Sequence, residues 1–362
     1  FYHTKLDVMS NEIARLRAAN KVANAKVDAL RSKLIPSNPA EASCLDRIAN
    51  VKASGAYENL VFEGGGTKGL AYCGALRILK EKGILRRIKR FAGSSAGAII
   101  ATLIAVGYTV EEIEIVISKT DFSDFLDDKF GLVRDVVSIF KEWGLAHGEY
   151  FSTFIEDLIG AKTGKPGLTF KELKNLMGVD LVITGTDLSA LQTRYFCETL
   201  TPSMKISQAV RISMSIPFMF VPVRDEDGCY HVDGGLVDNY PIHAFDGRYP
   251  GDEDALLNLC KVNPKTLGLK LLTPQEEVGH AITTRPSKID SLKDFTMAIM
   301  STLMVANERK HLRPSYWKRT MVIKVKDLPI TKFNLSTLEK HGLLDAGIKG
   351  GLKFFETSSQ SK

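Results

Sequence analysis

The feature that most constrains the fold is a turn of small residues, Gly-Ser-Ser-Ala-Gly, centred on Ser95. An apparent strand at 88–92 runs into this turn, and an apparent helix at 96–106 leaves it. Such a turn strains the backbone and crowds the helix against the strand, so only small residues fit beside its centre. The pattern is typical of a nucleophile elbow, which projects a serine hydroxyl from the top of a sheet. Beside Ser95, the elbow consists of Gly93, Ser94, Ala96 and Gly97.

A second glycine-rich turn lies upstream, between a short buried strand at 57–62 and a helical stretch at 70–82. The strand-loop-helix order leaves free backbone amides at a helix N-terminus, where negative charge is favoured. Acyl transfer from an ester develops an oxyanion, and one fixed donor stabilises it by about 3 kcal/mol. We assign the amides of Gly65 and Gly66 as the donors. The predicted oxyanion hole comprises Gly64, Gly65, Gly66, Thr67, Lys68 and Gly69.

A third motif, Asp233-Gly234-Gly235, ends a run with strand-like alternation and places one carboxylate at a strand end. A carboxylate of ordinary pKa, about 3.9, is a weak base for a hydroxyl. A direct hydrogen bond from Ser95 in a site closed to water would let proton transfer accompany attack. His231 and His243 lie nearest in sequence and leave a conventional triad open, although we favour ordinary sheet or rim positions for both.

Nucleotide binding is the main alternative for the glycine loop, because Gly64 to Gly69 has the letters of the dinucleotide fingerprint Gly-x-Gly-x-x-Gly. Such a site also needs an acidic residue at the tip of the second strand. Here that strand ends in Gly93-Ser94-Ser95, which carries no carboxylate. A phosphate-binding P-loop is disfavoured as well, because Lys68 is followed by Gly69 rather than by Ser or Thr.

Together the three motifs, in this order, resemble the patatin-like phospholipase family. The resemblance continues through the segments 169–173, 181–186, 209–213, 216–218 and 238–242. It implies a three-layer α/β domain with a mainly parallel central sheet. It also implies hydrolysis of acyl esters of phospholipids or related lipids, of phospholipase A or lysophospholipase type, without metal or cofactor. Carried over, Ser95 is the nucleophile and Asp233 the base of a dyad. Glu63 stands where the family often has Asp, and we expect little consequence because the carboxylate is kept.

Three apolar segments are candidates for lipid contact. By the resemblance, 216–222 forms a wall of the acyl pocket. The aromatic segment 121–143 is interpreted either as a lid or lipid-facing rim or as packing between helices. Methionines in the apolar helix expected at 295–305 could form an adaptable lipid surface, but core packing is the favoured interpretation.

The N-terminal segment has a different character. Apolar residues repeat there at alternating intervals of three and four, the pattern of a coiled-coil seam. We expect residues 1–34 to form a homodimer, the alternative being one amphipathic helix packed on the catalytic domain. The a positions are Leu6, Ile13, Asn20, Val27 and Leu34, and the d positions are Met9, Leu16, Ala23 and Leu30.

Prolines at 36 and 39 end this segment and suggest a division of the chain. The predicted parts are a coiled-coil segment (1–36), a linker (37–50), the catalytic domain (51–330) and a C-terminal helical extension with a polar tail (331–362). A further short helix is expected at 40–52.

Composition narrows the class of protein. The net charge of +6 is spread over 48 basic and 42 acidic residues, so nucleic-acid binding is not indicated. Five cysteines without a Cys-x-x-Cys pair indicate neither a disulfide framework nor zinc. The longest apolar run, 96–106, is shorter than the about 20 residues that span a bilayer. We expect a cytoplasmic enzyme that can contact membranes peripherally, with a secreted effector not excluded.

Two further functions stay open from the sequence. A dyad and an oxyanion hole do not encode substrate length, so an esterase of small soluble esters is one alternative. The other is an interaction protein that acts through its N-terminal helix and carries a vestigial hydrolase, although the intact motifs argue against it.

Overall fold

The structure is a computed structural model. It describes residues 39–126, 143–247, 250–251, 261–274, 313–326 and 334–356, with short pieces at 295, 298–299, 302–303, 328 and 332. The predicted coiled coil at 1–34 lies outside the described residues, so the homodimer stays a prediction.

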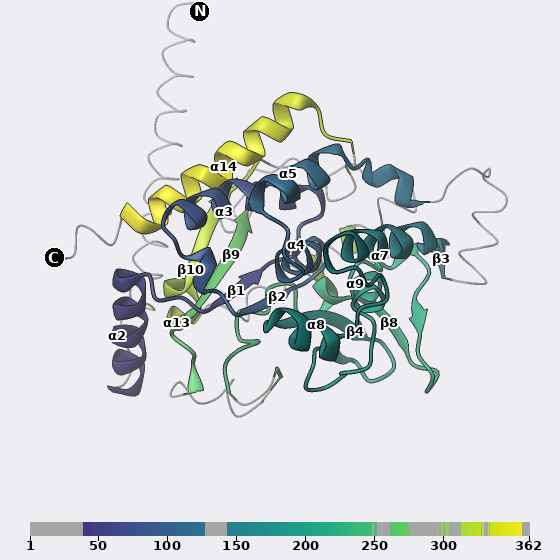
Figure 1. The fold of residues 1–362 in the computed structure, drawn as a ribbon, viewed down its shortest axis with the longest axis horizontal. Coiled ribbons are helices and arrows are strands. Elements are labelled where there is room, and N and C mark those ends of the chain that lie inside the picture. Colours follow the sequence, from purple (N-terminus) through teal and green to yellow (C-terminus); the bar gives the residue numbers. More distant parts are fainter. Residues whose placement is uncertain are drawn as a thin grey trace, which may run out of the picture.

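An eight-stranded sheet forms the centre, in the order β10-β9-β1-β2-β4-β8-β7, with β5 paired to β4 (Figure 1). The pairings from β10 to β4 are parallel, and those of β5, β8 and β7 are antiparallel. The mainly parallel central sheet is thereby confirmed. The strands are β1 (Asn59–Phe62), β2 (Arg90–Gly93), β4 (Asp180–Asp187), β5 (Gln192–Phe196), β7 (Val223–Arg224), β8 (Tyr230–Asp233), β9 (Thr266–Leu272) and β10 (Thr320–Lys324). A separate two-stranded sheet pairs β3 (Gly144–Ala146) with β6 (Phe218–Phe220).

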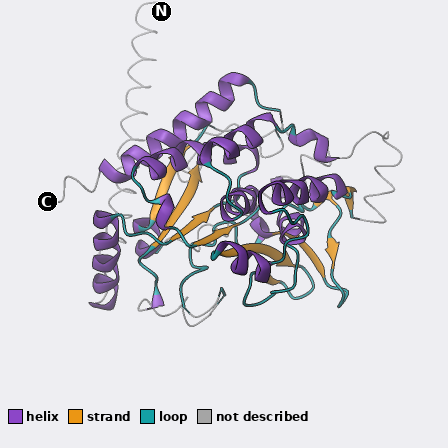
Figure 2. Ribbon diagram, in the orientation of Figure 1, coloured by secondary structure: helices purple, strands orange, loops and turns teal. Residues whose placement is uncertain are grey.

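Helices cover the sheet, as Figure 2 shows with purple helices packed around orange strands. The α-helices are α2 (Pro39–Ser54), α3 (Ala71–Glu81), α4 (Ala96–Ala105), α5 (Val110–Lys119), α7 (Glu149–Thr163), α8 (Phe170–Met177), α9 (Ile206–Ser213), α13 (Pro314–Lys318) and α14 (Thr337–Glu356). Short 3-10 helices are η1 (Gly66–Leu70), η2 (Leu85–Arg87), η3 (Phe122–Leu126) and η4 (Gly234–Leu236).

Two hydrophobic clusters lie on the two faces of the sheet, because successive strand residues point to opposite sides. Leu60 and Phe62 of β1 join the larger cluster, with α3, α4, α5, α7, α9 and α14. Val61 between them joins the smaller cluster, which Tyr240, Ile242 and Phe245 complete. The second face is therefore covered by the segment after β8 and by α13 rather than by long helices.

Three helices begin with a capping box, a sequence signal that fixes the first turn by reciprocal hydrogen bonds. Before α5, Thr109 Oγ1 accepts the Glu112 amide at 3.3 Å, and the Glu112 carboxylate accepts the Thr109 amide at 2.8 Å. The same pairs of bonds join Thr169 to Glu172 before α8 and Ser336 to Glu339 before α14. Local sequence thus sets the start of α5, α8 and α14.

The C-terminal helix α14 packs along α3 (Figure 1). A Cβ on Gly74 of α3 would overlap the Leu344 carbonyl oxygen, and one on Gly347 of α14 would overlap the Ala71 carbonyl oxygen. Glycine is required at both positions because of this close approach. The predicted limits of the catalytic domain stay a prediction, but α14 shares the core of residues 57–125.

Sequence-based element bounds needed small corrections. The strands expected at 57–62 and 88–92 are β1 and β2, which begin at Asn59 and Arg90. Parallel pairing starts only where both neighbours reach the sheet, at Asn59 opposite Arg90 and Thr266. The helix expected at 70–82 opens instead as η1, from Gly66. The short helix expected at 40–52 is confirmed as α2, and most of 121–143 and 295–305 lies outside the described residues.

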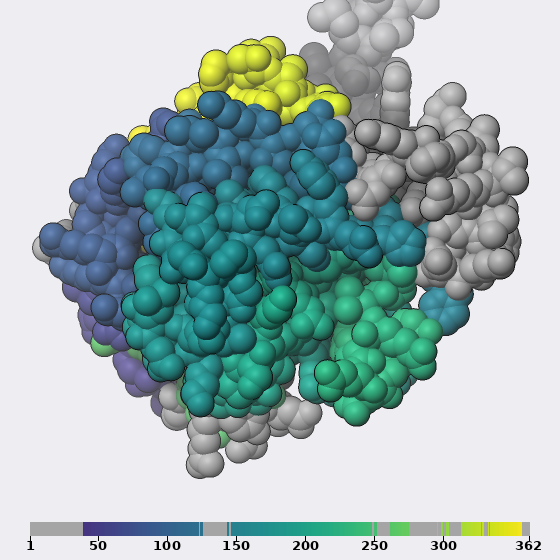
Figure 3. Space-filling model, turned by 45° about the vertical axis from the view of Figure 1, so that its right-hand side comes forward, coloured from purple at the N-terminus to yellow at the C-terminus, as the bar shows by residue number. Residues whose placement is uncertain are grey.

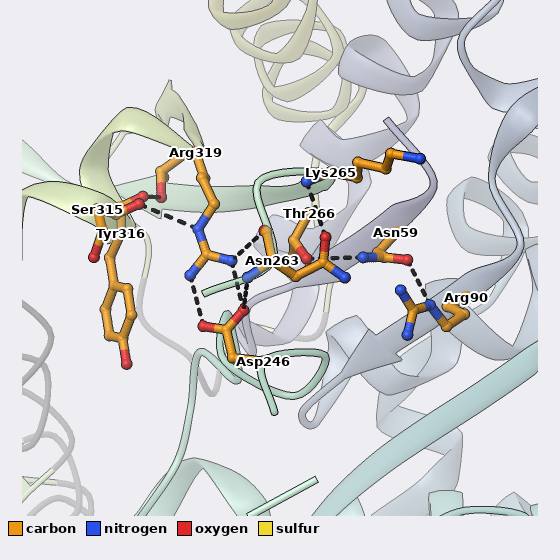
Figure 4. Close-up of polar contacts among 10 residues, drawn as sticks. Asn59, Arg90, Asp246, Asn263, Lys265, Thr266, Ser315, Tyr316 and Arg319 are labelled. Atoms are coloured by element: carbon orange, nitrogen blue, oxygen red, sulfur yellow. Dashed lines mark hydrogen bonds and ion pairs between the residues drawn. The ribbon is translucent and has the colours of Figure 1, made fainter. Parts of the chain in front are cut away.

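A buried ion pair fastens the edge of the sheet where β9 and β10 begin (Figure 4). The Arg319 side chain is fully buried, and its two terminal nitrogens donate to the Asp246 carboxylate at 2.8 and 2.9 Å. The guanidinium also donates to the carbonyl oxygens of Asn263 at 2.8 Å and Ser315 at 3.1 Å. Four hydrogen bonds therefore join three segments that are distant in sequence.

We expect Arg319→Met to lower the free energy of unfolding by about 3–5 kcal/mol, because it leaves the buried Asp246 carboxylate without its counter-ion. The double variant Arg319→Met with Asp246→Leu should recover much of this loss, since both charges are then removed. Urea unfolding measures both. The matched control, Arg194→Met at an exposed site on β5, should change stability by less than about 0.5 kcal/mol. Equal stability of Arg319→Met and the control would contradict the assignment.

Candidate active site

Strand register brings Ser95 and Asp233 to the same level of the sheet. Gly93 at the end of β2 pairs with Ile183 of β4, and Ser95 follows two residues later. Gly185, two residues further along β4, pairs with Asp233 at the end of β8. Because β8 runs antiparallel to β4, the C-terminal end of β8 lies beside the elbow. The elbow and the aspartate thus meet across β4 although 138 residues separate them.

Ser95 has the strained backbone expected at the centre of an elbow. Its φ is 51° and its ψ is −127°, a region that residues other than glycine rarely adopt. Ser213 at the end of α9 holds this turn, because its Oγ accepts the Ser95 amide at 2.8 Å. Glycine is required beside it: a Cβ on Gly97 would lie 2.5 Å from the Phe62 carbonyl oxygen, and one on Gly93 would overlap Gly97.

The Ser95 hydroxyl donates a hydrogen bond of 2.8 Å to Asp233 Oδ2. The other carboxylate oxygen, Oδ1, accepts the Gly235 amide at 2.6 Å. The turn at Gly234 and Gly235 thereby fixes the orientation of the carboxylate. Burial raises the pKa of Asp233 to about 7, although the bonds from Gly235 and Ser95 oppose this shift. A carboxyl group with a pKa near 7 accepts a proton more readily than an ordinary aspartate does.

Neither candidate histidine reaches this pair. His231 Nε2 lies 2.7 Å from Asp225 Oδ2. His243 Nε2 lies 3.0 Å from the Tyr195 hydroxyl, on the opposite face of the sheet. Besides Asp233, the described contact of the Ser95 hydroxyl is the Met214 sulfur at 3.7 Å. The geometry therefore favours a Ser-Asp pair over a triad.

The glycine loop approaches Ser95 through Gly64. A Cβ on Gly64 would lie 3.0 Å from the Ser95 Cβ and would overlap Asn239 Oδ1. Asn239 holds the loop through two hydrogen bonds to Gly64. Its carbonyl oxygen accepts the Gly64 amide at 3.0 Å, and its Nδ2 donates to the Gly64 carbonyl oxygen at 3.2 Å. The Gly64 amide is therefore engaged and is not an oxyanion donor.

The amides of Gly65 and Gly66 differ from that of Gly64 in their hydrogen bonding. Neither donates a hydrogen bond to any described residue, whereas the Lys68 amide donates to the Gly65 carbonyl oxygen at 3.3 Å. Gly66 has a φ of +56°, in the left-handed region that favours glycine. Thr67 fixes the far side of the loop, because its Oγ1 donates to the Lys332 carbonyl oxygen at 2.9 Å. Gly65 and Gly66 thus remain the candidate donors.

Glu63 anchors the start of this loop to the neighbouring strand β9. Its buried carboxylate accepts the Leu271 amide at 2.8 Å and forms an ion pair with the Lys270 ammonium. Its carbonyl oxygen accepts the Tyr72 hydroxyl at 2.6 Å. Glu63, which stands where the family often has Asp, therefore anchors the loop through both its carboxylate and its carbonyl oxygen.

An apolar pocket opens beside Ser95, and its walls come from the elbow helix, the glycine loop, α5, η3, α7 and the segment after α9. Ile216 and Phe220 confirm the prediction that 216–222 contributes a wall. Phe122 and Phe125 show that the start of 121–143 packs at this pocket. The lining residues are Gly66, Thr67, Gly69, Ser95, Ala96, Ile99, Ile100, Ile117, Phe122, Phe125, Phe151, Met214, Ile216 and Phe220.

Arg211 of α9 holds the pocket wall that comes from the segment after α9. Its guanidinium donates to the His147 carbonyl oxygen at 2.6 Å and to the Val221 carbonyl oxygen at 3.0 Å. It also lies over the Phe220 ring, 5.3 Å from the centroid. A buried cation thereby holds the ends of β3 and β6 together at the pocket.

The described parts of the chain contain no group of three or more His, Cys, Asp or Glu side chains arranged to hold a metal ion. Within the same residues, no helix combines the length and apolar character needed to cross a bilayer.

Comparison with known proteins gives the family. The model of the patatin-like phospholipase family matches residues 60–246, which include the elbow, the glycine loop and Asp233. The chain belongs to the patatin-like phospholipase family. It is 32% identical over 294 residues to the uncharacterized protein R571 of Acanthamoeba polyphaga mimivirus, an alignment that covers 81% of this chain and 91% of that protein. It is also 32% identical over 189 residues to the probable lipid hydrolase 463L of Invertebrate iridescent virus 6, covering 51% of this chain and 62% of that protein.

The fold agrees with a solved structure of similar architecture. VipD from Legionella pneumophila superposes with a TM-score of 0.53 and 17% sequence identity, covering 83% of this chain and 67% of that chain. At this identity the likeness concerns the fold alone. The patatin-like sheet with its covering helices is thus confirmed for this chain.

Sequence reasoning missed three residues that position the candidate site of this family member. Asn239 and Ser213 lie in segments that carry the resemblance without an assigned role, and Met214 lies between two such segments. All three act on Ser95 or its loop from more than 100 residues away. The spacing of residues along the chain carries no signal for such contacts, because they depend on how α9 and β8 pack.

We expect Gly64→Ala to slow labelling of Ser95 by a fluorophosphonate at least about a hundredfold, the range for loss of one oxyanion donor. The added methyl group must displace Asn239 or the elbow, which moves the neighbouring amides. Labelling rates measured beside thermal unfolding midpoints test this. In the control Gly342→Ala on α14 the methyl group enters open space, so labelling should not change. Wild-type labelling of Gly64→Ala would contradict the tight approach.

Proposed function

We propose that this protein hydrolyses acyl ester bonds of phospholipids or related lipids, as a phospholipase A or lysophospholipase, through a Ser95–Asp233 dyad. The observation that carries the proposal is the 2.8 Å hydrogen bond between the two side chains at the mouth of an apolar pocket. Membership of a lipid hydrolase family and the relative named as a probable lipid hydrolase support the substrate class.

In the first half-reaction, Ser95 Oγ attacks the ester carbonyl carbon while its proton passes to Asp233 Oδ2. The carbonyl oxygen becomes an oxyanion, which the amides of Gly65 and Gly66 would hold. The intermediate collapses to an acyl-serine, and the leaving alcohol takes the proton from Asp233. In the second half-reaction, water gives a proton to Asp233 and attacks the acyl-serine. This releases the fatty acid and restores the Ser95 hydroxyl.

The burial of Asp233 suits this sequence, because its carboxyl group must gain and lose a proton in each half-reaction. A pKa near 7 keeps both forms accessible at neutral pH. The apolar lining beside Ser95 suits an acyl chain, which loses water contact on binding there.

We expect Ser95→Ala and Asp233→Asn each to lower kcat for ester hydrolysis by at least about a thousandfold, because each removes one half of the dyad. His231→Ala and His243→Ala should retain at least a tenth of the activity. Phosphatidylglycerol in neutral detergent micelles and a soluble butyrate ester serve as substrates.

Circular dichroism and thermal midpoints control for folding in all four variants. A folded histidine variant as inactive as Ser95→Ala would replace the dyad by a triad. Activity confined to the butyrate ester would instead favour an esterase of small soluble esters.

The pH dependence follows from the pKa of Asp233, which burial raises to about 7. Only the ionised carboxylate accepts the serine proton, so kcat/KM should rise with pH through about 7 and level off above pH 8. Below pH 6 it should fall close to tenfold per pH unit. Measuring kcat/KM on the butyrate ester from pH 5.5 to 9 tests this, since an aspartate with an ordinary pKa would give a flat profile.

A further inference from the structure

A polar recess lies directly beside the apolar pocket. Its volume is about 190 Å³, and it shares Thr67, Ile117 and Phe122 with that pocket. Thr67 follows the candidate oxyanion donors by one residue. The recess and the apolar pocket therefore share part of one wall, next to the candidate oxyanion loop.

The polar wall of the recess comes from the end of α5 and the segment that leads into α14. In Figure 3 the yellow atoms of α14 lie against the blue part of the chain that includes α3 and α5. Lys340 joins them, because its ammonium donates to the Ser118 carbonyl oxygen at 2.6 Å. The polar lining residues are Lys119, Thr120, Asp121, Asn334 and Lys340.

The charge of this lining is positive, with two lysines against one aspartate, or +1. The Asn334 side-chain amide donates to both oxygens of the Asp121 carboxylate, at 2.8 and 2.9 Å. The Lys340 ammonium has three N–H donors and uses one of them on Ser118. Lys119 is exposed and forms no ion pair with any described residue. Cationic donors thus remain for an anionic ligand.

We propose that this recess holds the phosphate of a glycerophospholipid whose acyl chain occupies the apolar pocket, with Lys119 and Lys340 as its cationic partners. The inference rests on the proposed function, because it places the ester at Ser95. In a glycerophospholipid only the glycerol carbons separate the ester from the phosphate, which matches a recess adjoining the oxyanion loop. Hydrogen bonds between an ammonium and a phosphate oxygen are among the strong ones in proteins.

The same geometry disfavours a triacylglycerol. Its third acyl chain would lie in the recess, where it would cover the lysine ammoniums and the Asp121–Asn334 pair without supplying a hydrogen bond. Covering polar groups in this way costs free energy. The recess therefore selects for the headgroup rather than for the acyl chain.

The test compares phosphatidylglycerol and triacylglycerol with identical acyl chains, both in neutral detergent micelles, using the full chain. We expect Lys119→Ala to lower the ratio of the two kcat/KM values, phospholipid over triacylglycerol, about tenfold, the scale of one charged hydrogen bond. Lys119→Glu should lower the ratio further. Lys171→Ala is the matched control, because Lys171 is exposed on α8 and lines neither the recess nor the pocket.

Lys340 needs a second variant, since it also caps the carbonyl end of α5 and its loss can destabilise the fold. Lys340→Arg keeps the charge and should keep the ratio, whereas Lys340→Met should lower it in protein that is still folded by its thermal midpoint. A ratio that Lys119→Ala leaves unchanged, or changes no more than Lys171→Ala does, overturns the proposal.

Inorganic phosphate distinguishes a free anion from a headgroup. If phosphate alters butyrate ester hydrolysis in wild type but not in Lys119→Ala, the recess binds a free effector and the headgroup assignment is wrong. If wild type hydrolyses none of the substrates, the proposed function fails. Calorimetry with Ser95→Ala then tests the headgroup assignment by binding alone. Short-chain phosphatidylglycerol should bind about tenfold tighter than the matching diacylglycerol. Adding Lys119→Ala to this variant should remove the difference in affinity.

Discussion

A close contact between the elbow helix α4 and the end of β1 sets the geometry around Ser95. Gly97 lies so near the strand that a Cβ there would be 2.5 Å from the Phe62 carbonyl oxygen and 2.6 Å from that of Glu63. This approach brings the glycine loop, which continues from Glu63, against Ser95. It also forces the Ser95 backbone into its strained conformation, because the helix must start at once beside the sheet. The candidate nucleophile and oxyanion donors are therefore consequences of one packing contact.

The site has two buried acidic residues, and they differ in the partners of their carboxylates. The Glu63 carboxylate is buried with a counter-ion, Lys270, and serves to hold the loop. Asp233 is buried with only neutral donors, so desolvation raises its pKa and makes it the stronger base. The carboxylate with a cation beside it therefore anchors the loop, and the carboxylate with only neutral donors is the candidate base.

The C-terminal helix takes part in both the core and the site. Its glycines allow it to touch α3 backbone to backbone, and its first turn supplies Lys340 to the recess beside the apolar pocket. Segments from both ends of the described chain therefore shape the surroundings of Ser95. Lys340 lies outside the three motifs, although it lines the recess that we propose holds a lipid phosphate.

The sequence by itself determined the elbow and the glycine loop, because glycine at strand ends is a local signal. The candidate dyad and the mainly parallel sheet followed from the resemblance of these motifs to a known family. The sequence also determined the helix starts at Thr109, Thr169 and Ser336, where the capping partners lie three residues apart. Only the tertiary structure decided that β8 runs antiparallel to β4, which places Asp233 at Ser95 and removes His231 from it. The contacts of Ser213, Asn239 and Lys340 likewise depend on packing between distant segments, and side-chain burial, which sets the pKa of Asp233, exists only once the chain is folded.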